Sequence, residues 1–340
     1  MKAIVYIKDQ GLAVREVPTP RTGTGEVLVR VVDTGFCGSD HSLIAGGLVP
    51  DGYILGHETS GVVDQLGEGV QGPAVGTRVI IRPTFCGRCR DCCMGKPYFC
   101  QNGRRTIGVG DLPGGFAQYL LAFPDMLIPV PDGVDSENAA LAEAFAAALH
   151  GIRCARGRGG SALVVGGGPI GLALMMLLKL LNFGPVVLSE PIEFKRRLAQ
   201  DLGADAVLDP TEGDLRGRCL ELTDGVGFNT VYECSGSQAG VSAAVDVAAR
   251  GGTVCIVSVI FREIMIRALD MTFKELLLTA SYSNTHEENR QILDWMARNK
   301  LDGRPLVSDR IHLQDLPRIY RERIETGKAV KVMVKIGDGF

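Results

Sequence analysis

The chain has 340 residues, and its 36 basic and 39 acidic residues give a net charge of -3 at pH 7. No long run of either sign is present, which argues against a partner surface of nucleic acid or anionic lipid. The hydrophobic fraction of 46% and the 44 glycines are typical of a globular α/β protein. The length exceeds what one ordinary core supports and favours more than one domain.

From the first residue to about residue 135, short apolar segments alternate with Gly and Pro. This pattern predicts antiparallel strands. The opening residues alternate like a strand and lack the apolar region of a signal peptide, and the apolar stretch from Leu172 is interrupted by Lys179. We therefore expect a cytoplasmic protein without membrane attachment. The predicted strands are residues 2–7, 26–32, 60–67, 77–83, 117–122 and 126–131.

The first chemical motif is "CGSDH", residues 37–41. Its residue types are compatible with a catalytic nucleophile and its supporting residues, with some of the ligands of a metal site, or with a polar turn. The short spacing of Cys37 and His41 does not define a Cys-His hydrolase. The next motif, "LGHETSG", supplies His57 and Glu58 at a predicted strand start. Cys, His and carboxylate are the ligand set of an open, catalytic zinc site.

A cluster of cysteines follows in "CGRCRDCCMGKPYFC". A register through Cys86, Cys89, Cys92 and Cys100 keeps an even spacing of the first three thiols and predicts a closed, structural zinc site. Cys93 is then the extra cysteine, although a register through it is the alternative. A redox-active cluster or a disulfide in this loop are the competing interpretations.

The pattern changes after residue 135 to a long Ala-rich helix, and then to apolar strands that alternate with helices. This order predicts βαβ units and a doubly wound parallel sheet. A helix over residues 286–300 follows, and the closing strand, residues 329–336, is expected to return to the first domain. The predicted domains are residues 1–140, 141–282 and, as a return to the first domain, 283–340.

The first strand of this alternation runs into "GGGPIGL", where Gly166, Gly168 and Gly171 stand in G-x-G-x-x-G register at the head of a helix. Glycines are needed there for the tight turn, for the approach of pyrophosphate and for helix packing, and the helix N-terminus favours phosphate. We expect Pro169 and Ile170 to line the same dinucleotide site. The alternative is a glycine-rich turn of some other α/β sheet.

The second strand ends in Glu190, where an acidic residue grips the ribose hydroxyls of NAD and repels the 2′-phosphate of NADP. Lys195 and Arg196, one helical turn later, could soften that preference. The pattern favours NAD, with NADP the less favoured cofactor.

Together these motifs resemble the zinc-containing medium-chain alcohol and polyol dehydrogenases, in the branch of sorbitol, butanediol and threonine dehydrogenases. The resemblance covers almost the whole chain through "GFCGSD", "GHETSG", the four-cysteine lobe, "LAEAFAAALH", "GGGPIGL", "SE" and "ECSG". It implies a mostly-β GroES-like catalytic domain, a Rossmann coenzyme domain, two zinc ions per chain and a homodimer or homotetramer. It also implies reversible NAD-linked oxidation of a secondary alcohol to a ketone, through a zinc alkoxide and hydride transfer.

The same resemblance implies which residues surround the catalytic zinc. Cys37 and His57 are ligands, Glu58 is a ligand or a close partner of the ligands, and Glu143 is a fourth ligand or the acceptor for a zinc-bound water. In the related branch a Pro usually follows this last Glu, whereas this chain has Ala144.

Within "CGSDH", the resemblance implies that Ser39 accepts the substrate proton and that Asp40 orients the zinc-bound histidine. Relatives often carry a relay histidine five residues after the cysteine, where this chain has Ser42. His41 stands one position earlier, so the relay runs through His41, through Ser42 and water, or directly to solvent.

Two rival functions have specific sequence features. A zinc-independent quinone or enone reductase on the same scaffold usually lacks the Cys and His-Glu set that this chain carries. A zinc-ribbon module for nucleic acid would need a basic excess, but Asp91 interrupts the basic residues of the cysteine lobe. The substrate is left open among polyols, diols, cyclitols and aminocyclitols, because the segment "SLIAGGLVPDGY" is not specific for any of them.

Overall fold

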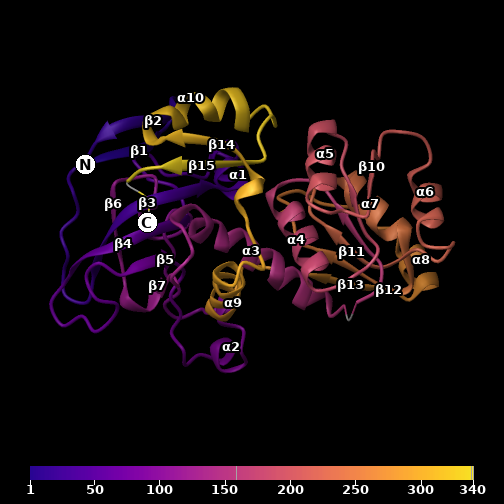
Figure 1. Ribbon diagram of the computed structural model, residues 1–340, viewed down its shortest axis with the longest axis horizontal. Coiled ribbons are helices and arrows are strands. Elements are labelled where there is room, and N and C mark those ends of the chain that lie inside the picture. The colour runs from indigo at the N-terminus through magenta and orange to yellow at the C-terminus, as the bar shows by residue number, and fades with distance from the viewer. Residues whose placement is uncertain (158, 338, 340) are drawn as a thin grey trace. The chain divides into compact units, whose positions relative to one another are not determined.

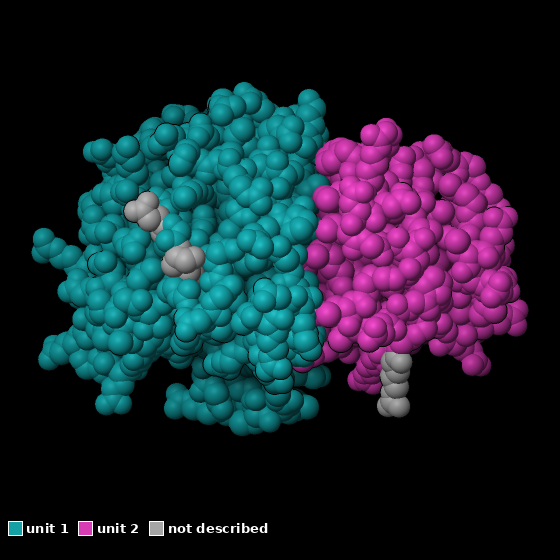
Figure 2. Space-filling model, in the orientation of Figure 1, with its two compact units in different colours: residues 1–143, 285–340 teal, residues 144–284 magenta. Residues whose placement is uncertain are grey.

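The computed structural model describes residues 1–157, 159–337 and 339. Two compact units divide the chain: Met1–Glu143 with Thr285–Phe340, and Ala144–Asn284 (Figure 2). Among the described helices, none combines the length and the apolar character needed to cross a bilayer.

The first unit is built mainly of strands (Figure 1). Its larger sheet has the order β14-β15-β3-β4-β5-β7, with β6 also paired to β3, and β1 and β2 form a separate hairpin. All pairings are antiparallel except that of β14 with β15. The elements are β1 Lys2–Ile7, β2 Gly11–Glu16, β3 Val27–Phe36, α1 Gly38–Ala45, β4 Glu58–Leu66, β5 Arg78–Ile81, α2 Arg90–Cys93, η1 Pro97–Phe99, β6 Tyr119–Ala122, η2 Pro124–Met126, β7 Leu127–Pro129, α9 His286–Ala297, η3 Arg304–Leu306, β14 Val307–His312, η4 Leu313–Asp315, α10 Leu316–Ile319, η5 Tyr320–Ile324 and β15 Lys331–Lys335.

Strand register in this sheet brings three distant segments together. Gly35 near the end of β3 pairs with Glu58 at the start of β4, and Phe36 pairs with Val332 near the start of β15. Cys37 follows β3 directly, and His57 directly precedes β4. The residues of "CGSDH", the residues of "GHETSG" and the start of the closing strand therefore lie at one edge of the sheet.

The second unit is a parallel sheet with the order β10-β9-β8-β11-β12-β13. The order reverses beside β8, as in a doubly wound fold, and Figure 1 shows α4 and α5 on one side of the sheet and α6, α7 and α8 on the other. The elements are α3 Ser136–Ala155, which starts in the first unit, β8 Ala162–Val165, α4 Pro169–Leu180, β9 Val186–Ser189, α5 Glu193–Asp201, β10 Ala206–Leu208, α6 Leu215–Glu221, β11 Phe228–Glu233, α7 Gln238–Val247, β12 Ala248–Ile256, α8 Ala268–Lys274 and β13 Leu277–Ala280.

Candidate metal centres and cofactor site

The first candidate metal centre lies at the edge of the sheet where β3 ends and β4 begins. Ligand atoms of Cys37, His57 and Glu58 all lie within 4.8 Å of one another. Cys37 is the N-cap residue of α1. His57 and Glu58 are buried. A soft thiolate, an imidazole and a carboxylate in this arrangement match the donors that zinc takes in proteins.

The two ring nitrogens of His57 have different neighbours. Nδ1 lies 3.3 Å from Oδ1 of the buried Asp40, and Nε2 lies 3.4 Å from Oγ of Ser39. Desolvation is the largest influence on the pKa of His57 and lowers it, but Asp40 and Cys37 together raise that pKa well above its usual value. The pocket therefore favours positive charge at the imidazole, which fits a metal cation at Nε2 and an Nδ1–H donated to the carboxylate.

Glu58 has a buried cationic neighbour, Lys331, which was not expected from the sequence. Nζ of Lys331 lies 2.7 Å from Oε1 and 2.6 Å from Oε2 of Glu58, and it also donates to the carbonyl of Phe36 at 3.2 Å. Burial alone would lower the pKa of Lys331, but the charge of Glu58 raises it above the usual value. Gly35 leaves room for this pair, because a Cβ there would lie 2.1 Å from Oε2 of Glu58.

Glu143 lies outside the group of three ligands in the described part of the chain. Its Oε1 accepts a hydrogen bond of 3.0 Å from Nη2 of Arg82, and both side chains are largely buried. Its charge is near enough to Lys331 to raise the pKa of that ammonium group. The carboxylate is therefore close to the centre and already carries a buried cationic partner.

His41 and Ser42 make different contacts. Nδ1 of His41 lies 3.1 Å from the hydroxyl of Tyr320, whereas Oγ of Ser42 donates to the carbonyl of Gly38 within the same helix at 3.0 Å. Burial raises the pKa of Tyr320 to about 12, so its hydroxyl keeps its proton at neutral pH. Of the two side chains, His41 is the one that reaches beyond α1.

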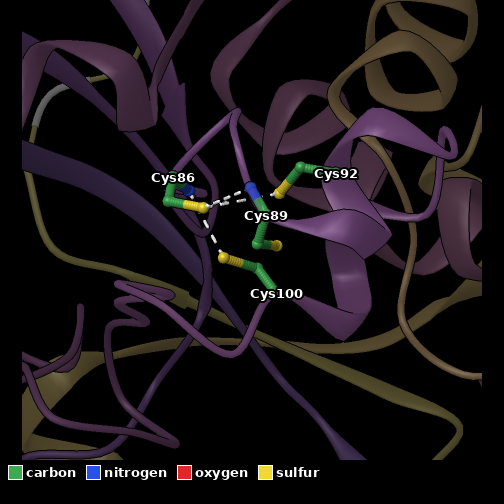
Figure 3. Close-up of side chains that lie close together, drawn as sticks. All are labelled: Cys86, Cys89, Cys92 and Cys100. Carbon is green, nitrogen blue, oxygen red and sulfur yellow. Dashed lines mark hydrogen bonds between the residues drawn. The ribbon is translucent and has the colours of Figure 1, made fainter.

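The second candidate metal centre is formed by Cys86, Cys89, Cys92 and Cys100, whose sulfur atoms lie within 4.8 Å of one another. Figure 3 shows the four sulfur atoms around a common point, with the side chains coming from the turn before α2, from α2 and from the end of η1. Cys93, the last residue of α2, is exposed and lies outside this group. Four thiol ligands leave no open position for a substrate.

Backbone amides support thiolate charge in this lobe. The amide of Cys89 donates to Sγ of Cys86 at 3.3 Å, and the amide of Cys86 donates to Sγ of Cys100 at 3.3 Å. Hydrogen bonds from the amides of Arg88 and Cys89 lower the pKa of Cys86 to about 6. Desolvation and the neighbouring thiol of Cys89 raise the pKa of Cys92 to about 12. Four sulfur atoms this close cannot all ionise without a cation, which a zinc ion would provide.

The predicted glycines of the dinucleotide site have distinct structural roles. Gly166 has φ of 104°, and a Cβ there would lie 2.9 Å from the amide nitrogen of Ser235. Gly168 is the N-cap of α4 and borders open space, whereas a Cβ at Gly171 would lie 1.9 Å from the carbonyl oxygen of Gly166. Pro169 and Ile170 form the first turn of α4. The unfilled space beside a helix N-terminus suits a pyrophosphate group.

Glu190 lies directly behind this glycine turn, at the end of β9. Its carboxylate accepts from the amides of Gly167 at 2.7 Å and Ile192 at 2.9 Å. Arg196 is held by Asp209 at 2.8 Å and by the carbonyl of Glu190 at 2.8 Å. Lys195 on α5 is partly exposed, and its Nζ lies 6.0 Å from the centroid of the Phe194 ring.

Sequence reasoning missed two buried cations, Lys331 and Arg82, beside the first centre. A signal was present for the first, because Lys331 interrupts the apolar run "AVKVMVKI", and a charge inside such a strand needs a partner. Arg82 directly follows the apolar residues "VII" of β5 and gave a weaker signal of the same kind.

Family models match most of the chain. Residues 23–132 match the alcohol dehydrogenase GroES-like domain, and residues 169–298 match the zinc-binding dehydrogenase domain. The predicted fold, a GroES-like domain with a Rossmann-type domain, is thereby confirmed.

Known proteins resemble the chain over its whole length. A sorbitol dehydrogenase from Halalkalibacterium halodurans is 32% identical over 98% of this chain and 99% of that protein. A 2-dehydro-3-deoxy-L-galactonate 5-dehydrogenase from Pseudoalteromonas atlantica is 30% identical, over 98% of each. The crystal structure of a zinc-binding dehydrogenase from Sinorhizobium meliloti 1021 bound to NADP is 32% identical, has a TM-score of 0.89 and covers 98% of both chains.

Proposed function

The chain belongs to the family of zinc-containing medium-chain alcohol and polyol dehydrogenases, and on that premise we propose that it oxidises a secondary alcohol to a ketone, reversibly, with NAD. It is an oxidoreductase of small-molecule alcohols that uses zinc and a nicotinamide cofactor. We take the substrate class to be polyols, diols, cyclitols or aminocyclitols. The observation that carries the proposal is the group of the half-buried Cys37 and the buried His57 and Glu58, with Ser39 beside the imidazole.

We assign Cys37, His57 and Glu58 to the catalytic zinc, with Glu143 as a further ligand or as a carboxylate that holds water beside the ion. When bound, zinc supplies Lewis acidity to the substrate hydroxyl, and the nicotinamide accepts the hydride. The hydroxyl of Ser39 takes the substrate proton, and its 3.4 Å contact with Nε2 places it beside the ligands. Asp40 keeps the imidazole of His57 in one orientation through Nδ1.

A second zinc ion per chain is proposed in the four-cysteine lobe, where it stabilises the fold rather than taking part in the reaction. None of the ten cysteines, which all lie within the described residues, forms a disulfide. Thiols of this kind are kept reduced in the cytoplasm, where we place the enzyme.

NAD is the proposed cofactor because of the contacts of Glu190. Two backbone amides hold its carboxylate at the end of β9, where a 2′-phosphate would meet negative charge. Arg196 is already occupied by Asp209 and by backbone carbonyls, so it offers little to such a phosphate.

We propose that the protein forms a homodimer, or a tetramer built from such dimers. The supporting features all lie in the second unit. Strand β13 is an edge of the parallel sheet, and its Leu277 and Leu278 are 47% and 37% exposed. Nearby in the sequence, Leu269 and Phe273 of α8 are 57% and 72% exposed. An apolar edge strand without Lys or Pro is a ready surface for pairing with a second copy of the same strand.

The proposed reaction is tested with purified enzyme and a panel of polyols, cyclitols, diols and simple secondary alcohols, each with NAD and with NADP. Formation of the reduced nicotinamide is followed by its absorbance. We expect NAD-linked activity that is lost in Cys37→Ser and His57→Ala while both variants keep cooperative unfolding. Full activity in a Cys37→Ser variant would overturn the proposal.

A further inference from the structure

The strand order of the parallel sheet reverses between the neighbouring strands β8 and β11. The residues that follow the carboxyl ends of these two strands therefore lie on either side of this point. In the sheet, β8 is flanked by β9 and β11, and the chain winds outward from β8 in one direction before it returns to β11. Ligands of open α/β sheets bind outside the carboxyl ends of the strands at such a point. Gly166 follows β8 on one side, and Glu233 ends β11 on the other.

The side chain of Glu233 is fully buried and satisfied by hydroxyl and amide donors. Its Oε1 accepts from the amide of Ser235 at 2.8 Å, from the amide of Gly236 at 3.0 Å and from the hydroxyl of Ser235. Its Oε2 accepts from the hydroxyl of Ser258 and, at 3.2 Å, from the amide of Gly236. No Lys or Arg pairs with it in the described part of the chain. These donors offset the cost of burying the charge.

Glu233 also joins two loops through its backbone. Its carbonyl accepts from the amides of Val257 at 2.9 Å and Ser258 at 3.1 Å, which follow β12. The carboxylate and the carbonyl together hold residues 234–237 and residues 257–258 at the same end of the sheet.

The glycine turn is in direct contact with this held segment. The amide of Cys234 donates to the carbonyl of Val165 at 2.8 Å, and a Cβ on Gly166 would lie 2.9 Å from the amide nitrogen of Ser235. On its other side, a Cβ on Gly240 in α7 would lie 2.7 Å from Oε1 of Glu233. The position of the segment after β11 therefore limits the space around the glycine turn.

We propose that Glu233 is a positioning residue for the nicotinamide cofactor: its carboxylate holds residues 234–237 and Ser258 as the wall that faces the glycine turn. This inference rests on the proposed function, because it takes the ligand of the turn to be a nicotinamide dinucleotide. Glu233 itself is 0% exposed and acts through the segment that it holds rather than by touching the cofactor.

Three substitutions separate this role from charge and from general stability. Glu233→Gln removes the charge but keeps the acceptor oxygen Oε1. Its NH2 group replaces Oε2 and can donate to the hydroxyl of Ser258. Glu233→Asp keeps the charge but draws the carboxylate back by one methylene group, and Glu233→Ala removes every acceptor. Ser161→Ala is the matched control, because the Ser161 hydroxyl links the same two strands at their opposite end. It donates to Oδ1 of Asn229 at 3.0 Å and accepts from the amide of Asn229 at 3.1 Å.

The experiment measures the dissociation constants of NADH and NADPH by fluorescence titration of the zinc-loaded enzyme without alcohol, with thermal unfolding of each variant. For the tighter-binding cofactor we expect weakening by about tenfold or more in Glu233→Ala, a smaller loss in Glu233→Asp, and a change within about threefold in Glu233→Gln. Ser161→Ala should lower the melting temperature and leave binding unchanged. At saturating cofactor, kcat should change less than the KM for the cofactor in each Glu233 variant.

The outcomes distinguish the two proposals. If the unchanged enzyme binds neither cofactor, the proposed function is wrong. If it binds one of them and Glu233→Ala binds equally well, the positioning role is wrong while the proposed function stands. If Glu233→Ala does not fold, the comparison of Glu233→Asp with Glu233→Gln decides: tighter binding by Gln supports the role, and equal or tighter binding by Asp contradicts it.

Discussion

Lys331 and Glu58 form a buried ion pair in which Nζ lies 2.6 and 2.7 Å from the two carboxylate oxygens. The exposed fractions of the two side chains are 1% and 0%. Removing one partner of such a pair leaves a buried charge without compensation. In metal-free protein, we expect Lys331→Met to lower the free energy of unfolding by about 3–5 kcal/mol, measured by urea denaturation.

The double variant Glu58→Gln with Lys331→Met supplies the control for that prediction. Because it removes both charges, it should be less destabilised than the sum of the two single variants. Additive losses would show that the ion pair does not couple the two residues.

The contacts of α1 predict which side chain carries the proton beyond Ser39. The side chain of His41 is hydrogen-bonded to Tyr320, outside α1, whereas the side chain of Ser42 is hydrogen-bonded to the carbonyl of Gly38 within α1. We expect His41→Ala to lower kcat by about tenfold and to recover activity when imidazole is added, while Ser42→Ala changes kcat by less than about twofold. Steady-state kinetics with and without imidazole test this. A larger loss in Ser42→Ala, or no loss in His41→Ala, would assign the relay to another route.

The four-cysteine lobe predicts a simple metal count. Cys92 points toward the other three sulfur atoms (Figure 3). The adjacent Cys93 is exposed and lies outside their group. Elemental analysis should find two zinc ions per chain in the unchanged protein and in Cys93→Ser, but one in Cys92→Ser. Loss of zinc from Cys93→Ser alone would show that the ligand register runs through Cys93.

Local motifs carried most of what could be inferred from the sequence. The glycines from Gly166 to Gly171 predict a strand, a turn and a helix, because the turn, the approach of pyrophosphate and the packing of the helix each require a glycine within these few residues. The cysteine lobe is likewise contained in 15 consecutive residues, Cys86 to Cys100. Such short-range requirements leave a clear pattern in the sequence.

The partners of the first centre depend on strand pairing instead. Lys331 is 273 residues from Glu58, and it meets that carboxylate only because β15 pairs with β3. Arg82 follows β5 and reaches Glu143 of helix α3, 61 residues further along the chain. In the sequence, Glu233 is marked only by the motif "ECSG", whereas one of its hydrogen-bond donors, Ser258, lies 25 residues away in the loop after β12. Neither spacing nor composition states which strands are neighbours, so these contacts required the fold.

The exposed edge of the parallel sheet predicts how copies of the chain associate. Leu278→Lys places a charge on β13, where it would block pairing of two edge strands. We expect this variant to have a lower mass in solution than the unchanged protein, measured by light scattering. Val226→Lys is a matched control, because Val226 is 65% exposed in the same unit but follows α6. An unchanged mass for Leu278→Lys would exclude β13 as the interface.

The contacts of Glu190 predict the cofactor preference and a way to reverse it. Its carboxylate is fixed by the amides of Gly167 and Ile192, so its negative charge cannot swing away from an incoming 2′-phosphate. Glu190→Gln removes that charge and keeps the size of the side chain. The ratio of kcat/KM for NAD to that for NADP should therefore fall by about tenfold or more. Lys195→Ala should move the same ratio in the opposite direction, because it removes a partly exposed positive charge from the helix that follows Glu190. A ratio that favours NADP in the unchanged enzyme, or that does not respond to Glu190→Gln, would show that another residue selects the cofactor.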